Sequence, residues 1–353
     1  MREAQESYSV RLATFVHISD LHFGDIDPNT GGVTYDARAP RTWANFKHFD
    51  GLLGHSYRAL QRLEKFFSDI RQREDAQLIV TGDLTSTGSQ EQFNTANDYM
   101  GSMLRPPKGN YIGLFVPAWK NRAIPGNHDH WPGSVRILGA PVALAFNLPT
   151  LPLLEPYSVT LLTGQPLPIT FVKINTDADV NPYSWNRALA RGSFCSQLAA
   201  AARMLGLPKR DEIRVLLLHH SRAHQGRTLR MDTASRQALD PFLVEQDVAV
   251  VLSGHTHDPH VQPFSVTHHG KTIEALEARC GTTLQTDTFP YYWKNILGRR
   301  PSRQLPRNTL LVHRLLEENN EVIWHAQTYN RTPYGFDKSP SGPEYRLKVW
   351  PRP

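Results

Sequence analysis

The chain places a glycine and two histidines directly after a short apolar run, in the segment VAVVLSGHTHDPH. Residues 248 to 252 are continuously apolar and mostly β-branched, which predicts a strand buried on both faces. Such strands belong to the interior of an α/β sheet, so this feature narrows the possible folds more than any other. Loops at the ends of buried strands often carry binding and catalytic residues. Taken by itself, the tetrapeptide GHTH fits a solvent-exposed turn equally well.

Similar apolar runs alternate with helical patterns along most of the chain, which favours an α/β fold with largely internal strands. From residue 309 onward two apolar runs flank a turn and predict an antiparallel hairpin, and therefore a second sheet. The predicted strands are 14–18, 78–80, a short one before Pro125, 169–174, 213–218, 248–252, 309–316 and 322–326, and the predicted helices lie within 57–75, 198–205 and 236–243.

Long segments rich in glycine and proline interrupt this pattern. We expect a single domain over residues 10–335, with loop insertions near 24–56, 131–156 and 285–308, and a loosely held C-terminal tail over 336–353. Insertions of this length are more often functional than structural.

The composition is that of a globular protein, with 40% hydrophobic and 20% charged residues among 353. The N-terminus lacks a basic region followed by an apolar stretch, and the chain has no long apolar run, so we expect a cytoplasmic protein without a membrane span. Cys195 and Cys280 are too few for a disulfide framework or a thiolate metal site.

The net charge of +6 favours an anionic partner such as a phosphate ester, a nucleotide or nucleic acid. Arg222, Arg227 and Arg230 could clamp a phosphate or could lie in a solvated loop. Aromatic residues do not alternate with the basic ones, as a stacking platform for single-stranded nucleic acid would require. A small phosphate ester is therefore the expected partner, and nucleic acid is the less favoured one.

Five of the predicted internal strands end in residues of one chemical kind, namely carboxylates, imidazoles and an amide. Because the carboxyl ends of strands in an open α/β sheet converge on one edge, these residues can meet in space. They are Asp20 and His22, Asp83 after Gly82, Asn127, His128 and Asp129 after Gly126, His219 and His220, and His255 and His257.

Oxygen and imidazole groups without thiolate suit Mn, Fe, Zn or Co. Alternate residues of an extended segment point to one side, so Asp20 and His22, like His255 and His257, could flank an ion. Asp83 follows a glycine and could bridge two cations, which together stabilise an in-line phosphoryl displacement. Taken singly, Asp83 could equally be a helix cap, Asn127 a turn residue and His128 a surface histidine.

The five motifs, in this order over roughly residues 14 to 284, resemble those of the calcineurin-like metallophosphoesterase superfamily. A finer resemblance is to the branch of class III cyclic-nucleotide phosphodiesterases and glycerophosphodiesterases, carried by GDLTSTGSQEQF, IPGNHDHW and GSFCSQL. This chain departs from that branch after the histidine strand, where Ser221 and Arg222 stand in place of two prolines.

The resemblance implies a four-layer αββα sandwich of two mixed β-sheets flanked by helices. It also implies two metal ions, one held by Asp20, His22, Asp83 and His257 and the other by Asp83, Asn127, His219 and His255. His128 would stabilise the transition state or protonate the leaving oxygen, with Asp129 fixing its orientation. Of the neighbouring pair, we assign the ligand role to His219 and a supporting or substrate-contacting role to His220.

The predicted function is therefore hydrolysis of a phosphate ester by a hydroxide shared between two metal ions, with a small or cyclic-nucleotide phosphodiester as the expected substrate. The alternatives are a phosphomonoesterase, a nuclease and a catalytically silent metal-binding scaffold. Among the other histidines we expect a core position for His17 and surface positions for His48, His55, His130, His224, His260, His268 and His269.

Overall fold

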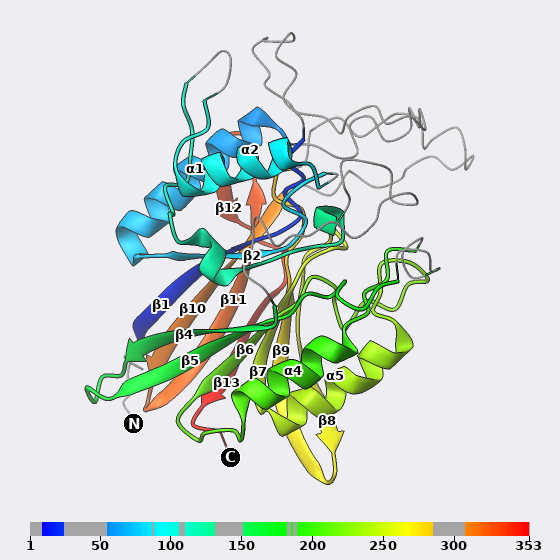
Figure 1. Ribbon diagram of the computed structural model, residues 1–353. Coiled ribbons are helices and arrows are strands. Elements are labelled where there is room, and N and C mark those ends of the chain that lie inside the picture. The colour runs from blue at the N-terminus through cyan, green and yellow to red at the C-terminus, as the bar shows by residue number, and fades with distance from the viewer. Residues whose placement is uncertain are drawn as a thin grey trace.

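Two β-sheets lie face to face and carry helices on their outer surfaces (Figure 1). The computed structural model describes residues 9–24, 55–86, 88–105, 110–130, 151–181, 185, 189–284 and 308–352. The predicted four-layer αββα sandwich of two mixed sheets is confirmed, because separate apolar clusters fill the space between each pair of adjacent layers.

The first sheet has the order β12-β11-β10-β1-β2-β3, with β13 also paired to β11. Strands β1, β2 and β3 are parallel to one another, whereas β10 and β11 form the antiparallel hairpin predicted from the sequence. The strands are β1 (Ser9–Ile18), β2 (Gln77–Thr81), β3 (Ala123–Ile124), β10 (Thr309–Glu318), β11 (Glu321–Arg331), β12 (Phe336–Lys338) and β13 (Glu344–Trp350).

The second sheet has the order β4-β5-β6-β7-β9-β8. Its central strands β5, β6, β7 and β9 are parallel, and antiparallel strands close both edges. The strands are β4 (Leu153–Thr160), β5 (Pro166–Lys173), β6 (Ile213–Leu217), β7 (Val248–Ser253), β8 (His260–His268) and β9 (Lys271–Arg279).

Helices α1 (Tyr57–Glu74) and α2 (Gln90–Gly101) cover the first sheet, and α4 (Cys195–Leu205) and α5 (Thr233–Glu245) cover the second (Figure 1). The α1 side chains spaced at helical intervals are buried, as an amphipathic stripe requires. Two short 3₁₀ turns, η2 (Trp119–Arg122) and η3 (His128–His130), flank β3.

The apolar layer between the sheets is mostly aliphatic and includes three buried aromatic side chains, of which Phe15 contacts the other two. Phe15 of β1 stacks on Trp324 of β11 with ring centroids 5.7 Å apart, and it meets Phe171 of β5 edge to face at 5.4 Å. Strands β1 and β5 belong to different sheets, so Phe15 links the two halves of the sandwich.

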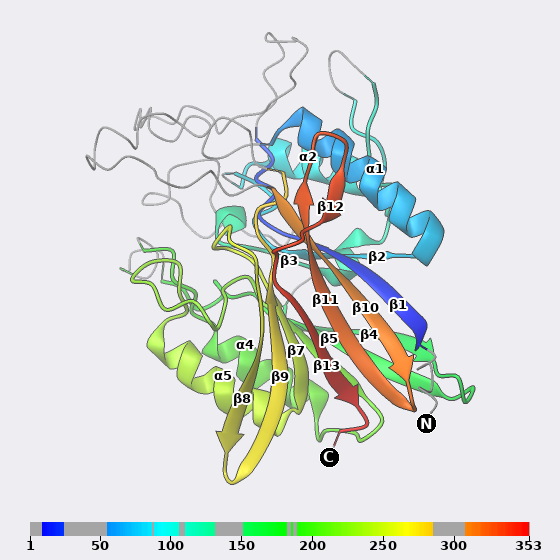
Figure 2. The same ribbon diagram turned by 180° about the vertical axis from the view of Figure 1, so that it is seen from behind.

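The C-terminal segment differs from the prediction of a loose tail. Strand β13 pairs with β11 along its length (Figure 2). Leu347 and Val349 of β13 are buried in the apolar layer between the sheets. Arg352 then donates hydrogen bonds to the carbonyls of Asp247 and Glu274, which attach the chain end to the second sheet. The short apolar alternation of 345–349 was the available signal for this strand.

Strand β4 begins at Leu153, inside the predicted insertion 131–156, while 131–150 lie outside the described residues. The predicted insertions 24–56 and 285–308 also lie outside them, apart from their first or last residues. The hairpin of β8 and β9 and helix α2 were not predicted. Among the described residues, no helix is long and apolar enough to cross a membrane, and Cys195 and Cys280 are unpaired.

Candidate metal centre

The loops that follow β1, β2, β3, β6 and β7 meet at one end of the sandwich, as the sequence predicts. Main-chain hydrogen bonds join them in pairs: the Asp20 N–H donates to Gly82 O, and the Gly254 N–H donates to His219 O. Because parallel strands present their carboxyl ends at the same edge, both sheets contribute side chains to this point.

Five of the candidate ligands have left-handed backbone conformations. The φ angles are 52° at Asp20, 49° at His22, 49° at Asp83, 75° at His255 and 57° at His257. The expectation that an extended chain aligns Asp20 with His22, and His255 with His257, is therefore wrong. These conformations are unfavourable for residues other than glycine, and they persist where the surrounding structure fixes them, commonly at functional sites.

Two glycines allow the loops to approach so closely. A Cβ atom on Gly82, whose φ is +96°, would collide with the Nδ1 atom of His219 and lie 2.8 Å from the backbone of Gly126. A Cβ atom on Gly254 would collide with Ser19 Oγ and lie 2.8 Å from Asp20 Oδ2. Each glycine precedes a candidate ligand, so its missing side chain makes room for the next loop.

One set of candidate ligands consists of Asp20, His22 and His257. The Nε2 atoms of His22 and His257 lie 3.2 Å apart, and His257 Nε2 lies 3.3 Å from Asp20 Oδ1. The other oxygen of Asp20 accepts a hydrogen bond from the His255 N–H. The carboxylate is thus held by the backbone on one side and presents its free oxygen to the imidazoles.

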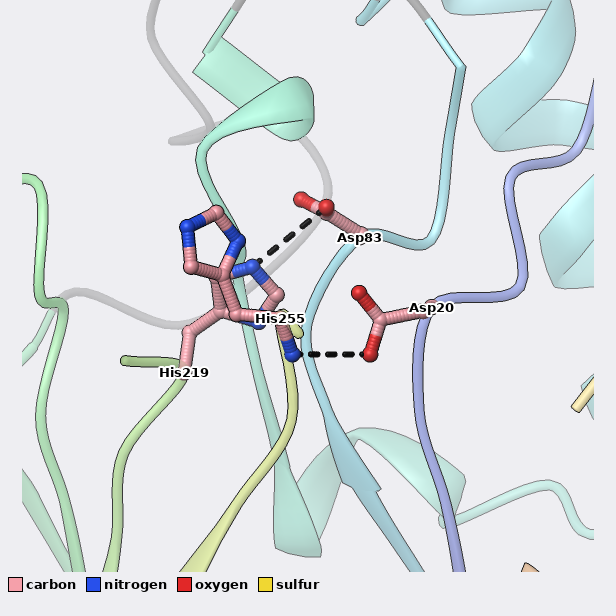
Figure 3. A group of neighbouring side chains, drawn as sticks. All are labelled: Asp20, Asp83, His219 and His255. Carbon is pink, nitrogen blue, oxygen red and sulfur yellow. Dashed lines mark hydrogen bonds and ion pairs between the residues drawn. The ribbon is translucent and has the colours of Figure 1, made fainter. Parts of the chain in front are cut away.

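The second set consists of Asp20, Asp83, His219 and His255 (Figure 3). His219 Nε2 lies 3.4 Å from Asp83 Oδ2 and 3.3 Å from Asn127 Oδ1. Asn127 therefore joins this set, as expected. The four residues of Figure 3 come from loops of both sheets and are all buried.

Asp83 belongs to the second set and also faces the first. Its Oδ2 atom is 3.4 Å from His219 Nε2 on one side and 3.8 Å from His22 Nε2 on the other. Its Oδ1 atom accepts a hydrogen bond from the His128 N–H. This position fits the predicted bridging role, because one carboxylate faces the imidazoles of both sets.

The charges of the site are strongly interdependent. Burial alone would raise the pKa of Asp83, but the neighbouring imidazoles of His219 and His128 hold it well below its usual range. Burial lowers the pKa of His219, and the Asp83 carboxylate more than offsets this and raises it to about 10. Burial and the nearby His128 lower the pKa of His22 to about 3. The buried carboxylates are thus stabilised by positive charge nearby. A proton on an imidazole can supply this charge, and so can a bound divalent cation.

The donor groups fit a pair of transition-metal ions. Asp20 Oδ1 is buried and receives no hydrogen bond from the described residues, although it points toward His257. Such an unsatisfied buried oxygen is costly unless a cation binds it. Two imidazole Nε2 atoms at 3.2 Å would either share a proton or both bind one ion. Oxygen and imidazole ligands without thiolate match Mn, Fe, Zn or Co.

His219, and not His220, faces the carboxylates. The Nδ1 atom of His219 lies 2.7 Å from the Thr81 carbonyl, so Nδ1 carries a hydrogen and Nε2 is the ring nitrogen that faces Asp83. The ring nitrogens of His220 both make hydrogen bonds elsewhere, to Thr176 Oγ1 and Ala190 O. The ligand role of His219 stays a prediction, for which its position beside Asp83 is the supporting observation.

His128 lies at the edge of the cluster, with its Nε2 atom 3.9 Å from Asp83 Oδ2. Its Nδ1 atom lies 2.8 Å from the carbonyl oxygen of Ser86, to which it donates. The carbonyl of Ser86 therefore sets the orientation of the ring, which leaves Nε2 directed at the site.

Asp129 does not have the predicted role of orienting His128. One of its oxygens accepts hydrogen bonds from the Leu84 and Gly126 N–H groups, and the other from the N–H and hydroxyl of Thr85. Both oxygens are thus used to tie the loop after β2 to the loop after β3. The family resemblance implied that Asp129 orients His128, whereas in the structure the donors of the two loops occupy both oxygens of Asp129.

Arg222 does not act as the phosphate clamp considered from the sequence. Its guanidinium forms two hydrogen bonds to Asp240, at 2.7 and 3.1 Å, and lies over the ring of Phe264. Glu277, which the sequence did not single out, accepts hydrogen bonds from Ser221 Oγ and the Arg222 and Ala223 N–H groups. The Glu277 carboxylate therefore holds the start of the loop after β6 through three hydrogen bonds.

Two histidines expected at the surface are buried. His55 accepts a hydrogen bond from the Gly24 N–H, and His130 Nε2 lies 3.1 Å from Asn175 Oδ1. His17 occupies the core position expected for it, between His313 and Thr81. His48 lies outside the described residues.

Comparison with known proteins finds distant similarity to solved structures. GAP50, the anchor in the inner membrane complex of Plasmodium, is 14% identical, with a TM-score of 0.46 over 96% of this chain and 89% of that one. Purple acid phosphatase PPD1 from yellow lupin (Lupinus luteus) is 11% identical, with a TM-score of 0.45 over 97% of this chain and 54% of that one. No curated protein sequence matches the chain.

The model of the calcineurin-like phosphoesterase family matches residues 13–259. This span covers most of the chain and includes every candidate ligand from Asp20 to His257. The chain therefore belongs to the calcineurin-like phosphoesterase family.

Proposed function

We propose that the protein is a metal-dependent hydrolase of small phosphodiesters, with a cyclic nucleotide as the specific candidate substrate. The observation that carries the proposal is that Asp83 faces the imidazoles of both ligand sets, with His128 beside it. The finer resemblance to cyclic-nucleotide phosphodiesterases, carried by 82–93, 124–131 and 192–198, supports a diester over a monoester.

In this proposal the chain holds two ions of Mn, Fe, Zn or Co. When bound, such ions lower the pKa of water to about 7 and neutralise the charge of a transferring phosphoryl group. The residues proposed to hold one ion are Asp20, His22, Asp83 and His257, and those proposed to hold the other are Asp83, Asn127, His219 and His255.

His128 is proposed to protonate the leaving oxygen. Because its Nδ1 donates to the Ser86 carbonyl, the proton that can be transferred is the one on Nε2. The Asp83 carboxylate, 3.9 Å from Nε2, stabilises positive charge on the ring before the transfer. The side chain is 14% exposed, so a substrate can reach it.

Arginines close to the site form hydrogen bonds within the protein, and this favours a small substrate over polymeric nucleic acid. Arg222 is committed to Asp240 and Phe264, and Arg191 donates two hydrogen bonds to the Arg227 carbonyl. Two of the arginines near the site are thus used within the protein. The net charge of +6 is the reason to test a nuclease as the alternative, because positive charge favours binding to nucleic acid.

The test is a comparison of kcat/KM for an aryl phosphomonoester, a bis-aryl phosphodiester, cyclic nucleotides and a single-stranded oligonucleotide, with Mn, Fe, Zn, Co or Mg across a salt series. The proposal expects the small diesters to be preferred and the cyclic nucleotides to be hydrolysed. A preference for the oligonucleotide that collapses with added salt would establish a nuclease. Metal binding without hydrolysis of any ester would establish a silent scaffold.

A further inference from the structure

His220 is fully buried beside the candidate centre and makes its hydrogen bonds away from it. Its Nδ1 atom lies 2.7 Å from Thr176 Oγ1, and its Nε2 atom lies 3.2 Å from the main-chain carbonyl oxygen of Ala190. A carbonyl can only accept, so Nε2 carries the hydrogen and Nδ1 accepts the hydroxyl hydrogen of Thr176. These two contacts use both ring nitrogens.

The same carbonyl oxygen of Ala190 lies 3.2 Å from Nε2 of His255. His255 must therefore also donate through Nε2, which leaves the lone pair of a neutral ring on Nδ1. Figure 3 shows one ring nitrogen of His255 facing the side chain of Asp83 and the other directed away from it. The rings of His220 and His255 are in contact, with centroids 4.2 Å apart.

The segment that carries this carbonyl is held firmly. Ala190 has a left-handed backbone, with a φ of 49°, which aims its carbonyl at the two histidines. Gly192 follows so closely that a Cβ atom there would lie 2.7 Å from His220 Nδ1. The Gly192 N–H donates to the Arg230 carbonyl, and the Leu229 N–H donates to the Leu189 carbonyl.

We propose that His220 is a positioning residue which, through the carbonyl oxygen of Ala190, orients His255 and selects Nδ1 as its metal-binding atom. His220 itself does not contact metal or substrate in this arrangement. The inference rests on the proposed metal-dependent function, because it concerns the orientation in which His255, a member of the second ligand set, faces a bound ion. Partners that fix the ring of a metal-binding histidine typically contribute 10- to 100-fold in metal affinity, to order of magnitude.

The experiment titrates the metal-free protein with Mn²⁺ and Co²⁺, measures the affinity of each of two sites and records the visible spectrum of bound Co²⁺. In His220→Phe an aromatic ring still fills the space, but both hydrogen bonds are lost. We therefore expect the metal at the site of His255 to bind about 10- to 100-fold more weakly and the affinity of the other site to stay unchanged. His220→Gln keeps an N–H that can reach the Ala190 carbonyl, and it should recover much of the affinity. Thr176→Val should show a smaller loss at the same site.

The matched control is His268→Phe, which replaces a surface histidine of β8 that contacts Glu245. It should leave both affinities and the Co²⁺ spectrum unchanged. Thermal denaturation of the metal-free variants separates positioning from general stability. If His220→Phe does not fold, Thr176→Val, which removes the hydroxyl bound to Nδ1 of His220, is the deciding variant.

Wild-type affinity at both sites in His220→Phe would overturn the inference and leave the proposed function standing. If His220→Phe does not fold, wild-type affinity at both sites in Thr176→Val would do the same. An equal loss at the two sites would also overturn it, because the effect would then be structural. A wild-type protein that binds neither ion would overturn the proposed function, and this inference with it.

Discussion

The Nδ1 atom of His219, at the end of β6, lies 2.7 Å from the carbonyl oxygen of Thr81, the last residue of β2 in the opposite sheet. This one contact joins the two sheets and fixes the imidazole, because the carbonyl requires a hydrogen on Nδ1. The Nε2 atom is then directed at Asp83, two residues after Thr81. The mutual position of the sheets thus determines the chemistry that the site can perform.

Replacing Asp83 by alanine should abolish metal binding and hydrolysis together. The side chain faces the imidazoles of both ligand sets, so its loss leaves several buried imidazoles without a counter-charge. Metal content by elemental analysis and kcat measured on one sample check this. Two bound metals in Asp83→Ala would exclude the bridging role.

Replacing His128 by alanine should reduce kcat by about 10²- to 10⁴-fold, the usual contribution of a general acid, while metal content stays at the wild-type level. The ring lies at the edge of the cluster and its orientation is set by Ser86, so its removal leaves the ligand sets intact. A variant depleted of metal would show that His128 is a ligand and not an acid.

Gly82→Ala should weaken metal binding because the added Cβ collides with His219 Nδ1 and approaches the backbone of Gly126. The matched control is Gly164→Ala, since Gly164 also has a positive φ, +81°, but has nothing within 4 Å of its Cβ position. Both variants should lose about 1 kcal/mol or more of unfolding free energy from backbone strain. The metal affinity, measured by titration, should fall in Gly82→Ala and stay unchanged in Gly164→Ala.

Metal should stabilise the fold as well as support catalysis. A ligand that binds the native state at 100 times its Kd adds about 2.7 kcal/mol to the unfolding free energy. We therefore expect the Tm of chelator-treated protein to rise when Mn²⁺ is added, and to stay constant for Asp83→Ala. Full phosphodiesterase activity after rigorous metal removal would contradict a metal-dependent mechanism.

The buried pair His17 and His313 should make the protein sensitive to acid. Their ring nitrogens are 3.2 Å apart, and burial lowers the pKa of His17 from 6.5 to about 3, although the charge of Asp20 opposes this. The native state thus binds fewer protons than the unfolded chain between these values, so this contribution to stability is complete above pH 6.5 and is lost progressively as the pH falls toward 3.

Replacement of His17 by glutamine tests this effect. The free energy of unfolding, measured in urea from pH 7 to pH 5, should fall less steeply in His17→Gln than in the wild type, by up to about 1.4 kcal/mol per pH unit. The slope is compared and not the absolute stability, because the substitution also changes packing. Equal slopes in the two proteins would mean that His17 gains its proton equally easily in both states.

The four-layer order of the sandwich was implied by the resemblance to a known family. From its own patterns the sequence predicted strands β1, β2, β3, β5, β6 and β7, the β10–β11 hairpin and the residues at the strand ends. These are local properties: Val248 to Leu252 are apolar without interruption, and buried strands of this kind belong in a sheet covered on both faces. The convergence of Asp20, Asp83 and His219 followed from topology, because parallel strands bring their carboxyl ends to one edge.

The conformations and hydrogen-bond partners of those residues were decided by the tertiary structure. Asp20 and His255 adopt left-handed backbone conformations that the local sequence does not predict. Asp129 accepts hydrogen bonds from the backbone of two loops instead of orienting its neighbour His128. Strand β13 forms because β11 offers an unpaired edge that lies next to it in space. The physical reason is the same in each case. The energy of a polar group or a strand edge depends on partners that the fold supplies from distant parts of the chain.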